Sequence, residues 1–390
     1  MTKKTLRVLA VGGGSGGHVT PVVAVIGELQ KQYPQVEVRF WCDRHFAPQA
    51  RRIIGDFDAS IPVQTVWAGK LRRYSHLSLW QHFTIPSILF PNIRDLFLVI
   101  VGFVQSTVRL LFSRPDVVFS KGGFVSLPVG WAAALLRIPL VIHDSDATPY
   151  LSHRLLAPFA KSIATGSPLE HYNYPVAKTT YVGIPINPEY KPYSDDRRNE
   201  LKHEFGFDSR KPLVVFIGGG LGAKQLNNAV AKQLSLLLDH TNVILISGSA
   251  QYDELRSLTP EADPRFILKD FVSQGLADIQ GAADIVVSRA GATALLELAA
   301  LAKPTILVPS KRLSWQIKHA EVYAKDQAVV LLDENNFELP DDQSLASAVI
   351  GLLDDPELQK RLASNIHRLA RPHAARDMAA MIIRASGRRR

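Results

Sequence analysis

The sequence has little sulfur, no long apolar run and no clustered carboxylates, and each absence excludes a class of protein. Cys42 is the single cysteine among 390 residues, so the chain forms no internal disulfide, which fits a reducing compartment. No run of about 18 apolar residues occurs, which argues against a membrane-spanning helix. The basic start Met1–Lys4 leads into an apolar run that Gly12–Gly17 ends too early for a secretory signal. No dedicated metal site is expected, and no basic stretch interleaved with aromatic residues predicts nucleic acid as a partner.

Acidic residues are scarce in the first half of the chain. Residues 1–185 hold 19 lysines and arginines against 10 acidic residues, whereas the remaining residues hold 26 of each. The net charge of +9 therefore comes entirely from the first half. We interpret this excess as a surface for an anionic partner, such as a lipid headgroup or a pyrophosphate. A solvated basic surface without a partner is the alternative.

Short β-branched runs alternate with helical patterns along the whole chain, which is typical of parallel sheets covered by helices. The expected strands are Leu6–Val11, Val36–Trp41, Val117–Phe119, Leu140–His143, Leu213–Ile217, Val243–Ile246, Ile285–Ser288 and Thr305–Val308. The expected helices include Pro21–Gln32, Gln225–Leu238 and Ala292–Leu301. The chain is long enough for two domains, and the prolines and glycine of Gly183–Pro188 predict a linker between them. We expect one domain over 1–185, a second over 186–370, and a C-terminal helix within 371–390 that packs back on the first.

Each half of the chain opens with a strand, a glycine-rich turn and a helix. The first turn, Gly12–His18, follows Leu6–Val11, and the second turn, Gly218–Ala223, follows Leu213–Ile217. Glycines let backbone N–H groups approach a phosphate, and the helix N-terminus adds a favourable dipole. A single turn of this kind is also a common way to pack a helix on a strand. Two of them at equivalent places predict two similar domains, which suits an enzyme that joins two phosphate-bearing molecules.

Polar residues follow several of the expected strands in the first half. His18 stands at the mouth of the first glycine turn, where a histidine could act as a general base or hydrogen-bond a phosphate. The loops Ser120–Pro128 and His143–Asp146 each follow a strand. Because parallel strands end at one edge of their sheet, we expect these loops to converge with His18 on a ligand. The alternatives are helix caps at Ser126 and Asp146, and a structural partner for His18 at its helix start.

The second half offers groups that suit a nucleotide sugar. Ser288–Thr293 ends a strand and starts a helix, whose N-terminal N–H groups could bind a diphosphate. Glu297 follows about one turn later, where a carboxylate could accept both hydroxyls of a ribose. Gln316 carries an amide that could read sugar hydroxyls. The alternatives are a solvated helix face for Glu297 and an ordinary surface glutamine for Gln316.

Leu79–Phe112 is the most apolar region of the sequence. We expect its second part, Leu96–Phe112, to form a core helix. We expect Trp80–Phe90 to form a partly exposed patch instead, because several basic residues flank it: Lys70, Arg72, Arg73 and Arg94. Apolar residues beside basic ones suit an anionic membrane surface.

Taken together, these motifs resemble the MurG family of peptidoglycan N-acetylglucosaminyltransferases. The similarity is carried, in the order of the family, by Gly13–His18, Gly69–Tyr74, Lys121–Ser126, Gly218–Ala223, Arg289–Glu297 and Gln316. It extends over nearly the whole chain. The resemblance implies an α/β fold of the GT-B type, with two Rossmann-like parallel-sheet domains that face a deep cleft.

The resemblance also implies the substrates and their places. The donor, UDP-N-acetylglucosamine, would bind the second domain. Phe271 and Val272 would lie at the uracil, Glu297 at the ribose and Gln316 at the sugar. The residues at the diphosphate would be Gly220, Gly222, Ala223, Arg289, Gly291, Ala292 and Thr293. The acceptor, an undecaprenyl-pyrophosphoryl-N-acetylmuramyl-pentapeptide, would bind the first domain. Its pyrophosphate would lie against Ser15, Gly16, Gly17 and His18, with Phe124 and Ser126 close by.

The implied reaction is a single displacement with inversion at the anomeric carbon. The muramyl 4-hydroxyl attacks, and UDP leaves with its charge stabilised by helix N-termini and Arg289, so no cofactor is required, although a divalent cation could assist. His18 is the first candidate for the base that takes the hydroxyl proton, and Asp146 is the second. The product would be the lipid-linked disaccharide of peptidoglycan, made by a peripheral enzyme on the cytoplasmic face of the cell membrane.

Several positions depart from the family pattern, and they lie around the donor and the acceptor: Asp146, Ile184, Asn187, Gly220, Leu221 and Trp315. A related inverting GT-B transferase that uses another nucleotide sugar or glycolipid acceptor is therefore the main alternative. An inactive binding paralogue is opposed by the joint presence of His18, Arg289, Glu297 and Gln316. A nucleotide-sugar epimerase needs no lipid acceptor, so the basic first half and the apolar patch speak against it.

Overall fold

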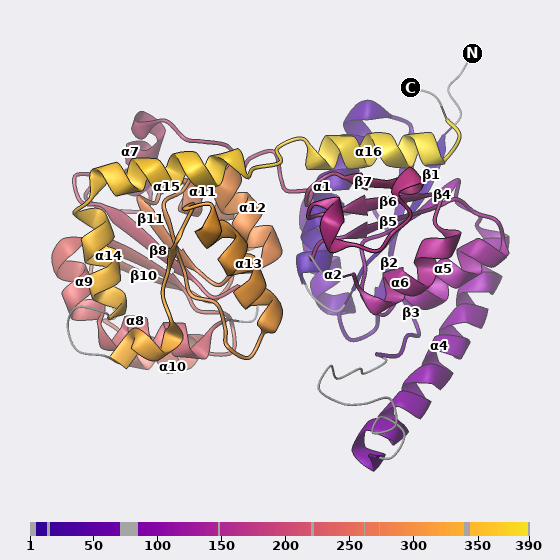
Figure 1. Cartoon of the computed structure of the whole chain (residues 1–390), viewed down its shortest axis with the longest axis horizontal. Helices are drawn as coiled ribbons and strands as arrows, with labels where there is room; N and C mark the ends of the chain where they lie inside the picture. Colours follow the sequence, from indigo (N-terminus) through magenta and orange to yellow (C-terminus); the bar gives the residue numbers. More distant parts are fainter. Residues whose placement is uncertain are drawn as a thin grey trace. The chain divides into compact units, whose positions relative to one another are not determined.

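A computed structural model gives the fold of the chain. It describes residues 5–13, 16–70, 85–146, 149–219, 222–260, 262–272, 274–338 and 344–388. The chain divides into two compact units (Figure 1). The first unit comprises Met1–Asn187 together with His373–Arg390, and the second comprises Pro188–Pro372. Each unit is built on one parallel sheet with helices on both faces, so the expected α/β class is confirmed.

The first unit contains a seven-stranded sheet whose neighbouring strands all run parallel. Across the sheet the strands are β3 (Val63–Val66), β2 (Val36–Asp43), β1 (Leu6–Val11), β4 (Val117–Ser120), β5 (Leu140–Asp144), β6 (Ser162–Thr165) and β7 (Thr179–Tyr181). The first six follow the doubly wound order typical of Rossmann-like domains. In such a sheet ligands bind beyond the carboxyl ends of the strands, where β1, β4 and β5 deliver their loops.

Helices cover both faces of the first sheet. One face packs against α1 (Gly16–Gln32), α2 (Ala47–Phe57) and α16 (Ala374–Ala385), and the other against α4 (Pro86–Phe112), α5 (Ser126–Leu135) and α6 (Leu151–Leu156). The short turns η1 (Ala157–Phe159), η2 (Leu169–His171) and η3 (Val176–Lys178) connect the later strands. Helix α16 comes from the C-terminal end of the chain and lies beside α1 (Figure 1), where it buries Met378 and Ile382.

Helix α1 begins earlier than the sequence pattern predicts. The expected start was Pro21, but the helix runs from Gly16 and contains this proline. A proline inside a helix removes one backbone hydrogen bond. The buried face formed by Val22, Ile26 and Leu29 compensates for that loss, because packing supplies most of the stability of a helix in a folded domain.

The second unit contains a six-stranded parallel sheet in the same doubly wound order. Across the sheet the strands are β10 (Phe266–Lys269), β9 (Asn242–Ile246), β8 (Leu213–Ile217), β11 (Ile285–Ser288), β12 (Thr305–Leu307) and β13 (Val330–Leu331). One face carries α8 (Lys224–Lys232), α9 (Leu234–His240), α10 (Tyr252–Leu258) and α14 (Leu345–Leu353), and the other carries α7 (Asp195–Glu204), α11 (Leu276–Ala282), α12 (Ala292–Ala300) and α13 (Ser314–Lys325). The turn η4 (Glu334–Glu338) precedes α14, and α15 (Pro356–Arg368) contributes to both apolar clusters.

The segment expected as one helix over Gln225–Leu238 is two helices, so that prediction is wrong. The break between α8 and α9 falls at Gln233, whose side chain is anchored to two other segments. Its Nε2 donates to the Phe337 carbonyl at 2.8 Å, and its Oε1 accepts from the Ala346 backbone N–H at 2.8 Å. These tertiary hydrogen bonds hold the glutamine at the junction, which helical periodicity alone could not reveal.

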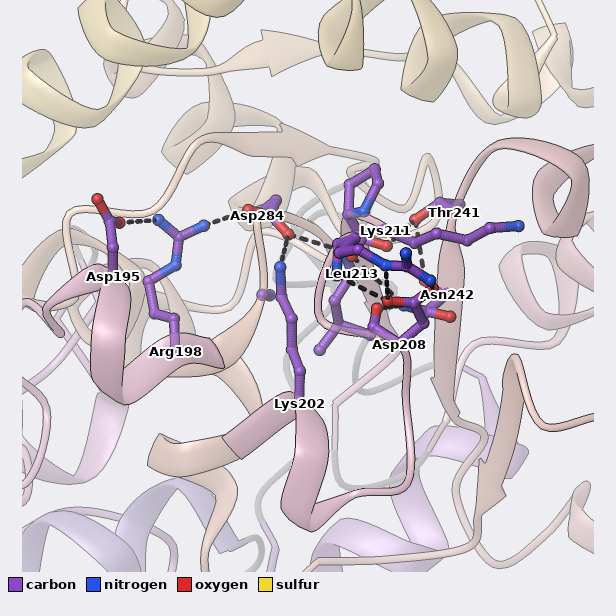
Figure 2. A network of polar contacts seen from close by, with 12 residues as sticks. Asp195, Arg198, Lys202, Asp208, Lys211, Leu213, Thr241, Asn242 and Asp284 are labelled. Atoms are coloured by element: carbon purple, nitrogen blue, oxygen red, sulfur yellow. Dashed lines mark hydrogen bonds and ion pairs between the residues drawn. The ribbon is translucent and has the colours of Figure 1, made fainter. Parts of the chain in front are cut away.

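Asp284 fastens α7 to the second sheet. It stands just before β11 and accepts hydrogen bonds from three groups (Figure 2). Its Oδ1 accepts from Arg198, and its Oδ2 accepts from Lys202 Nζ and from the Leu213 backbone N–H, each at 2.7 Å. The Lys202 side chain is only 5% exposed, so this carboxylate is the counter-charge of a buried ammonium. Arg198 also reaches the exposed Asp195 within α7 at 3.0 Å.

Helix α4 is not the core helix that the sequence predicts over Leu96–Phe112. One face is buried, with Ile88, Asp95, Val99, Gly102, Ser106 and Leu110 at helical spacing. At Gly102 a Cβ atom would overlap the Trp67 carbonyl oxygen, so this glycine permits the close approach of the helix to the preceding loop. The opposite face remains exposed and apolar, with Phe90, Ile93, Leu96, Phe97, Ile100, Val104, Val108, Leu111 and Phe112. The prediction failed because apolarity all along a helix does not distinguish a buried face from an unpartnered one.

Among the described residues, α4 is the one helix long and apolar enough to cross a membrane, with a mean hydropathy of 1.8 over its best window. Length and composition alone are weak evidence for a span. The helix also packs on α5 and on β3 of the first unit. We therefore treat it as a helix of the first unit with one uncovered apolar face. Residues 80–84 of the expected Trp80–Phe90 patch lie outside the described residues, and Phe90 at its other end is 68% exposed.

Candidate active site

The first glycine turn lies at the carboxyl end of β1. Gly12 donates its N–H to the Trp41 carbonyl at 3.2 Å, and a Cβ atom on Gly13 would lie 2.5 Å from the Asp43 carboxylate. Gly16 and Gly17 form the first turn of α1, as a phosphate-binding helix start requires. Ser15 lies outside the described residues, as does the side chain of His18. The backbone nevertheless places His18 in the first turn of α1, at the edge of the sheet where ligands bind.

The loop after β4 packs directly on this turn. Gly123 has a φ of +84°, and a Cβ atom there would lie 2.6 Å from the Gly13 carbonyl oxygen. Only glycine accepts both the left-handed backbone and the close approach. Ser126 is buried, and its hydroxyl donates to the Gly122 carbonyl at 2.8 Å, so it does not cap the helix that it begins. Phe124 is half-buried in the same loop.

A buried hydrogen-bonded chain lies beneath the loops after β4 and β5. Ser120 Oγ is 2.9 Å from His153 Nε2, and His153 Nδ1 is 2.8 Å from Asp144 Oδ1. Tyr174 donates its hydroxyl to the other oxygen of Asp144. All of Ser120, Asp144 and His153 are shielded from solvent. This arrangement orders the Asp144 loop from below and is too deeply buried to meet a substrate.

The sequence did not identify His153, Tyr150, Tyr172 or Tyr174 as parts of this region. Tyr172 donates to the Asp146 carbonyl at 2.6 Å and stacks on Tyr174 with ring centroids 5.8 Å apart. The Tyr150 hydroxyl hydrogen-bonds to the Asp146 carboxylate, and the pKa of Tyr150 is raised well above its usual value by burial and by Asp146 and Asp144. Tyr150 precedes α6, His153 lies in α6, and Tyr172 and Tyr174 follow η2, so no local motif marks them. Asp146 is therefore held by two tyrosines and is not a helix cap.

In the second unit, the second glycine turn is held against the end of β9. Gly220 and Leu221 lie outside the described residues. Gly222 has a φ of +77°, and a Cβ atom there would overlap the Ser247 carbonyl oxygen. Asn227, in the first turn of α8, donates to that same carbonyl at 2.8 Å. Ala223 is buried just before α8, so the turn delivers the helix start to the ligand edge of the sheet.

Helix α12 follows β11, the strand next to β8, and carries Glu297 about one turn after its start. Gly291 precedes the helix in an extended conformation, and no side chain caps the N–H groups at Ala292 and Thr293. Glu297 is buried, and burial raises the pKa of its carboxyl to about 8, although a hydrogen bond with Tyr190 opposes the shift. Glu297 is therefore not on a solvated helix face, and that alternative is wrong. The tyrosine was not found from the sequence.

Arg289 precedes α12 but its guanidinium is already engaged. Its Nη1 donates to the Glu334 carboxylate at 2.8 Å and to the Val308 carbonyl at 2.9 Å, and the side chain is only 9% exposed. The other oxygen of Glu334 accepts from the Lys311 backbone N–H at 3.1 Å. Arg289 thus ties the end of β11 to the segments that follow β12 and β13.

Gln316 and Trp315 lie in the first turn of α13. The Gln316 carboxamide oxygen accepts from the Ser310 N–H at 2.9 Å, and the residue is buried, so it is not an ordinary surface glutamine. Trp315 is 37% exposed, and its ring meets His319 edge to face at 5.7 Å. His319 Nδ1 lies 3.4 Å from the Ala290 carbonyl oxygen, next to the start of α12. This contact brings Gln316 and Trp315 to the same end of the second sheet as Glu297.

Phe271 and Val272 follow β10 at the same end and are half-buried. The proposed donor residues that the structure describes therefore lie in the loops and helices that follow β8, β10, β11 and β12, beyond the carboxyl ends of the strands. In the parts of the chain that the structure describes, no group of three or more His, Cys, Asp or Glu side chains is placed to hold a metal ion.

Each of the two parallel-sheet units has a glycine turn at the end of its first strand. Comparisons with known proteins show the class of protein that this arrangement belongs to. Residues 8–165 match the glycosyltransferase family 28 N-terminal domain, and residues 213–378 match the glycosyltransferase family 28 C-terminal domain. The solved MurG structure from Acinetobacter baumannii is similar with a TM-score of 0.68, at 21% identity, over 97% of this chain and 99% of that one. The class is a two-domain glycosyltransferase of the GT-B type.

Curated relatives narrow the class to one family. A Geobacillus thermodenitrificans protein named UDP-N-acetylglucosamine–N-acetylmuramyl-(pentapeptide) pyrophosphoryl-undecaprenol N-acetylglucosamine transferase is 35% identical over 359 residues, which is 91% of this chain and 93% of the relative. A protein of the same name from Geobacillus kaustophilus is 36% identical over 84% of this chain and 86% of the relative. The chain belongs to the MurG family.

The fold by itself does not separate this family from others. The UDP-GlcNAc 2-epimerase of Neisseria meningitidis has a TM-score of 0.65 against 97% of this chain at only 13% identity. That likeness shows a shared architecture alone. The family assignment therefore rests on the sequence match over both units.

Proposed function

We propose that the chain transfers N-acetylglucosamine from UDP-N-acetylglucosamine to the 4-hydroxyl of an undecaprenyl-pyrophosphoryl-N-acetylmuramyl-pentapeptide. The observation that carries this proposal is the identity of 35% to a transferase of that name across nine tenths of both chains. The chemistry of the second unit supports it, since an uncapped helix start precedes a buried carboxyl at α12. An uncapped helix start suits a diphosphate, and a buried carboxyl suits vicinal hydroxyls.

We assign the donor to the second unit. The N–H groups at Gly291, Ala292 and Thr293, with the turn that contains Gly222, would hold the diphosphate, and Glu297 would hold the ribose. Gln316 retains an amide nitrogen that could donate to a sugar hydroxyl while its oxygen is bound to Ser310. Phe271 and Val272 would contact the uracil. Arg289 contributes positive potential from its buried position and holds the surrounding loops, since its ion pair with Glu334 already uses Nη1.

We assign the acceptor to the first unit. Its pyrophosphate would meet Ser15, Gly16, Gly17 and His18 at the start of α1, with Phe124 nearby. Ser126 would act through the loop it closes, because its hydroxyl is bound to Gly122. The muramyl 4-hydroxyl would lose its proton to His18 or to Asp146 as it attacks the anomeric carbon. The leaving UDP would depart on the opposite face, and the configuration at that carbon would invert.

Product analysis with a panel of donors tests the choice of sugar. With the muramyl acceptor fixed, we expect UDP-N-acetylglucosamine to be used and its 4-epimer to be used poorly, and we expect the new glycosidic bond to be β. A preference for another nucleotide sugar would move the chain to a related transferase. A retained α configuration would contradict the single displacement.

Replacing Glu297 with alanine is expected to weaken UDP binding by roughly 10- to 100-fold, because a buried hydrogen bond to a charged or strongly polar group contributes about 1.5–3 kcal/mol. Titration calorimetry with UDP measures the effect. Glu357→Ala on the exposed face of α15 is the matched control and should bind UDP normally. An unchanged dissociation constant for Glu297→Ala would remove Glu297 from the ribose site.

The same residue makes a pH-dependent contribution to stability. Burial raises the pKa of Glu297 to about 8, from an ordinary value of 4.5, so the protonated form is favoured in the folded protein. The contribution of the protonated Glu297 carboxyl to the free energy of unfolding is therefore complete below about pH 4.5, and it is lost as the pH rises towards 8. Glu297→Gln, which stays neutral, should gain stability relative to the parent protein between pH 5 and pH 8.

We propose that the exposed apolar face of α4 rests on the cytoplasmic surface of the cell membrane. It presents large side chains along the whole helix, and the first half of the chain carries the entire positive excess. Burying one such side chain contributes roughly 1.5–3 kcal/mol. The double variant Phe97→Glu with Val104→Glu should therefore bind anionic vesicles at least tenfold more weakly in flotation assays. The control is Leu236→Glu, which changes an exposed leucine of the second unit. Equal vesicle binding by the parent protein, the double variant and this control would contradict the proposal.

A further inference from the structure

Lys121 is a lysine with no exposed surface, at the carboxyl end of β4. Lysine is almost never fully buried unless its charge is compensated. Its Nζ donates to the Ser145 hydroxyl, and the negative charges of Asp146 and Asp144 favour its charged form. An apolar side chain of similar length would fill this space without removing a charge from water. The buried ammonium therefore indicates that Lys121 has a function other than packing.

The backbone around Lys121 links the two loops assigned to the acceptor. Its N–H donates to the Val11 carbonyl at 2.8 Å, at the very end of β1. Two residues later, Gly123 packs against Gly13 of the first glycine turn. On the other side, the ammonium reaches Ser145 in the loop that follows β5. Lys121 thus lies between the proposed pyrophosphate turn and the loop that carries Asp146, the second candidate base.

The titratable groups around the ammonium have distinct partners. Asp144 accepts from His153 on α6 and from Tyr174 after η2, so its carboxylate is held by that chain. His143 contacts the Gly183 carbonyl through Nε2 at 2.8 Å. Burial and the charge of Lys121 hold the pKa of His143 well below its usual value, so His143 is neutral at pH 7. Asp146, with Tyr150 beside it, is the member of this cluster that is a candidate base in the proposed reaction.

We infer that Lys121 is a positioning residue for the acceptor site, whose buried ammonium fixes the Ser145 hydroxyl and holds the Asp146 carboxylate in place for turnover. This inference rests on the proposed transfer to the first unit. It goes further by assigning a functional requirement for positive charge to a residue that contacts neither substrate.

The charge of Lys121 should be lost within an accessible pH range. Burial lowers the pKa of Lys121 from 10.5 to about 8, although Asp146 and Asp144 partly restore it. Turnover that needs the ammonium should therefore fall as the pH rises through about 8. The free energy of unfolding should instead rise with pH. A lysine whose pKa is lowered on folding destabilises the fold while it is charged, and this destabilisation disappears between about pH 8 and pH 10.5.

The test is Lys121→Met in the full-length protein, with UDP release driven by the lipid-linked acceptor as the activity. We expect turnover to drop about 100-fold, because small misplacements of reacting groups have effects of that size. We also expect melting temperature to stay equal or rise and UDP affinity to stay unchanged. The alkaline decline near pH 8 should vanish from the residual activity. Ser145→Ala, which removes the hydroxyl partner, should lower turnover by a smaller factor and provides a second variant should Lys121→Met not fold.

Lys303→Met is the matched control. Lys303 is also buried, with its pKa lowered to about 7 by burial, but its Nζ donates to the Gly281 and Ala283 carbonyls at the end of α11 in the second unit. That variant should keep the alkaline decline. Normal turnover in Lys121→Met or Ser145→Ala, or an alkaline decline that survives in Lys121→Met, would overturn the inference alone. No activity in the parent protein would overturn the proposed function and this inference with it.

Discussion

Replacing His18 with alanine is expected to lower the turnover number by about 10²- to 10⁴-fold, which is the usual contribution of a general base. UDP affinity should hardly change. The reason is the division of the chain: His18 begins α1 in the first unit, whereas the groups proposed to bind UDP lie in the second. Steady-state UDP release and titration calorimetry measure the two quantities separately.

Asp146→Asn is the companion to this variant, because it keeps the shape of the other candidate base and removes its basicity. If His18 is the base, Asp146→Asn should lower turnover less than His18→Ala does, by no more than the roughly 100-fold loss expected for Lys121→Met. Normal turnover in His18→Ala together with a loss of at least 100-fold in Asp146→Asn would transfer the role to Asp146. A weakened UDP affinity in His18→Ala would contradict the assignment of the donor to the second unit.

Replacing Asp284 with alanine is expected to destabilise the second unit by about 3 kcal/mol, since removing one partner of a buried ion pair leaves the other charge uncompensated. Lys202 would remain buried without its carboxylate, and the Leu213 N–H would lose its acceptor. For a domain of this size such a change lowers the melting temperature by roughly 6–12 °C. Calorimetry that resolves the transitions of the two units measures it.

Asp195→Ala is the matched control for Asp284→Ala. Both carboxylates bind Arg198 (Figure 2), but the Asp195 side chain is 88% exposed, and an exposed pair on one helix contributes only about 0.3–0.5 kcal/mol. Equal melting temperatures for the two variants would show that the Asp284 network does not hold α7 on the sheet. A loss confined to the transition of the first unit would contradict the account as well.

The sequence predicted the α/β class and eight of the thirteen strands that the structure describes, because buried parallel strands are continuous apolar runs that local patterns reveal. It did not name β3, β6, β7, β10 and β13, which lie towards the edges of the two sheets. Thus Leu6–Val11 and Leu213–Ile217 have the bounds expected for them. The break at Gln233 and the exposure of α4 were not predictable in the same way. The first depends on hydrogen bonds to Phe337 and Ala346, which are distant in sequence, and the second on which neighbours cover a helix face.

The candidate site was predictable to a similar degree. Glycine turns and helix starts are local signals, so Gly222 and Gly291 could be read from motifs. The partners that set the chemistry are not local: Tyr190 lies far from Glu297 in the sequence, and Glu334 lies far from Arg289. The sequence therefore named the residues proposed for the donor site without the burial that raises the pKa of Glu297 to about 8.

The central claim is acceptor-dependent transfer of N-acetylglucosamine. UDP release by the purified full-length protein tests it most directly, with UDP-N-acetylglucosamine as donor and the lipid-linked muramyl-pentapeptide as acceptor. We predict release only when both are present, in step with formation of a lipid-linked disaccharide. Release that ignores the acceptor, or none from folded protein with this pair, would contradict the account.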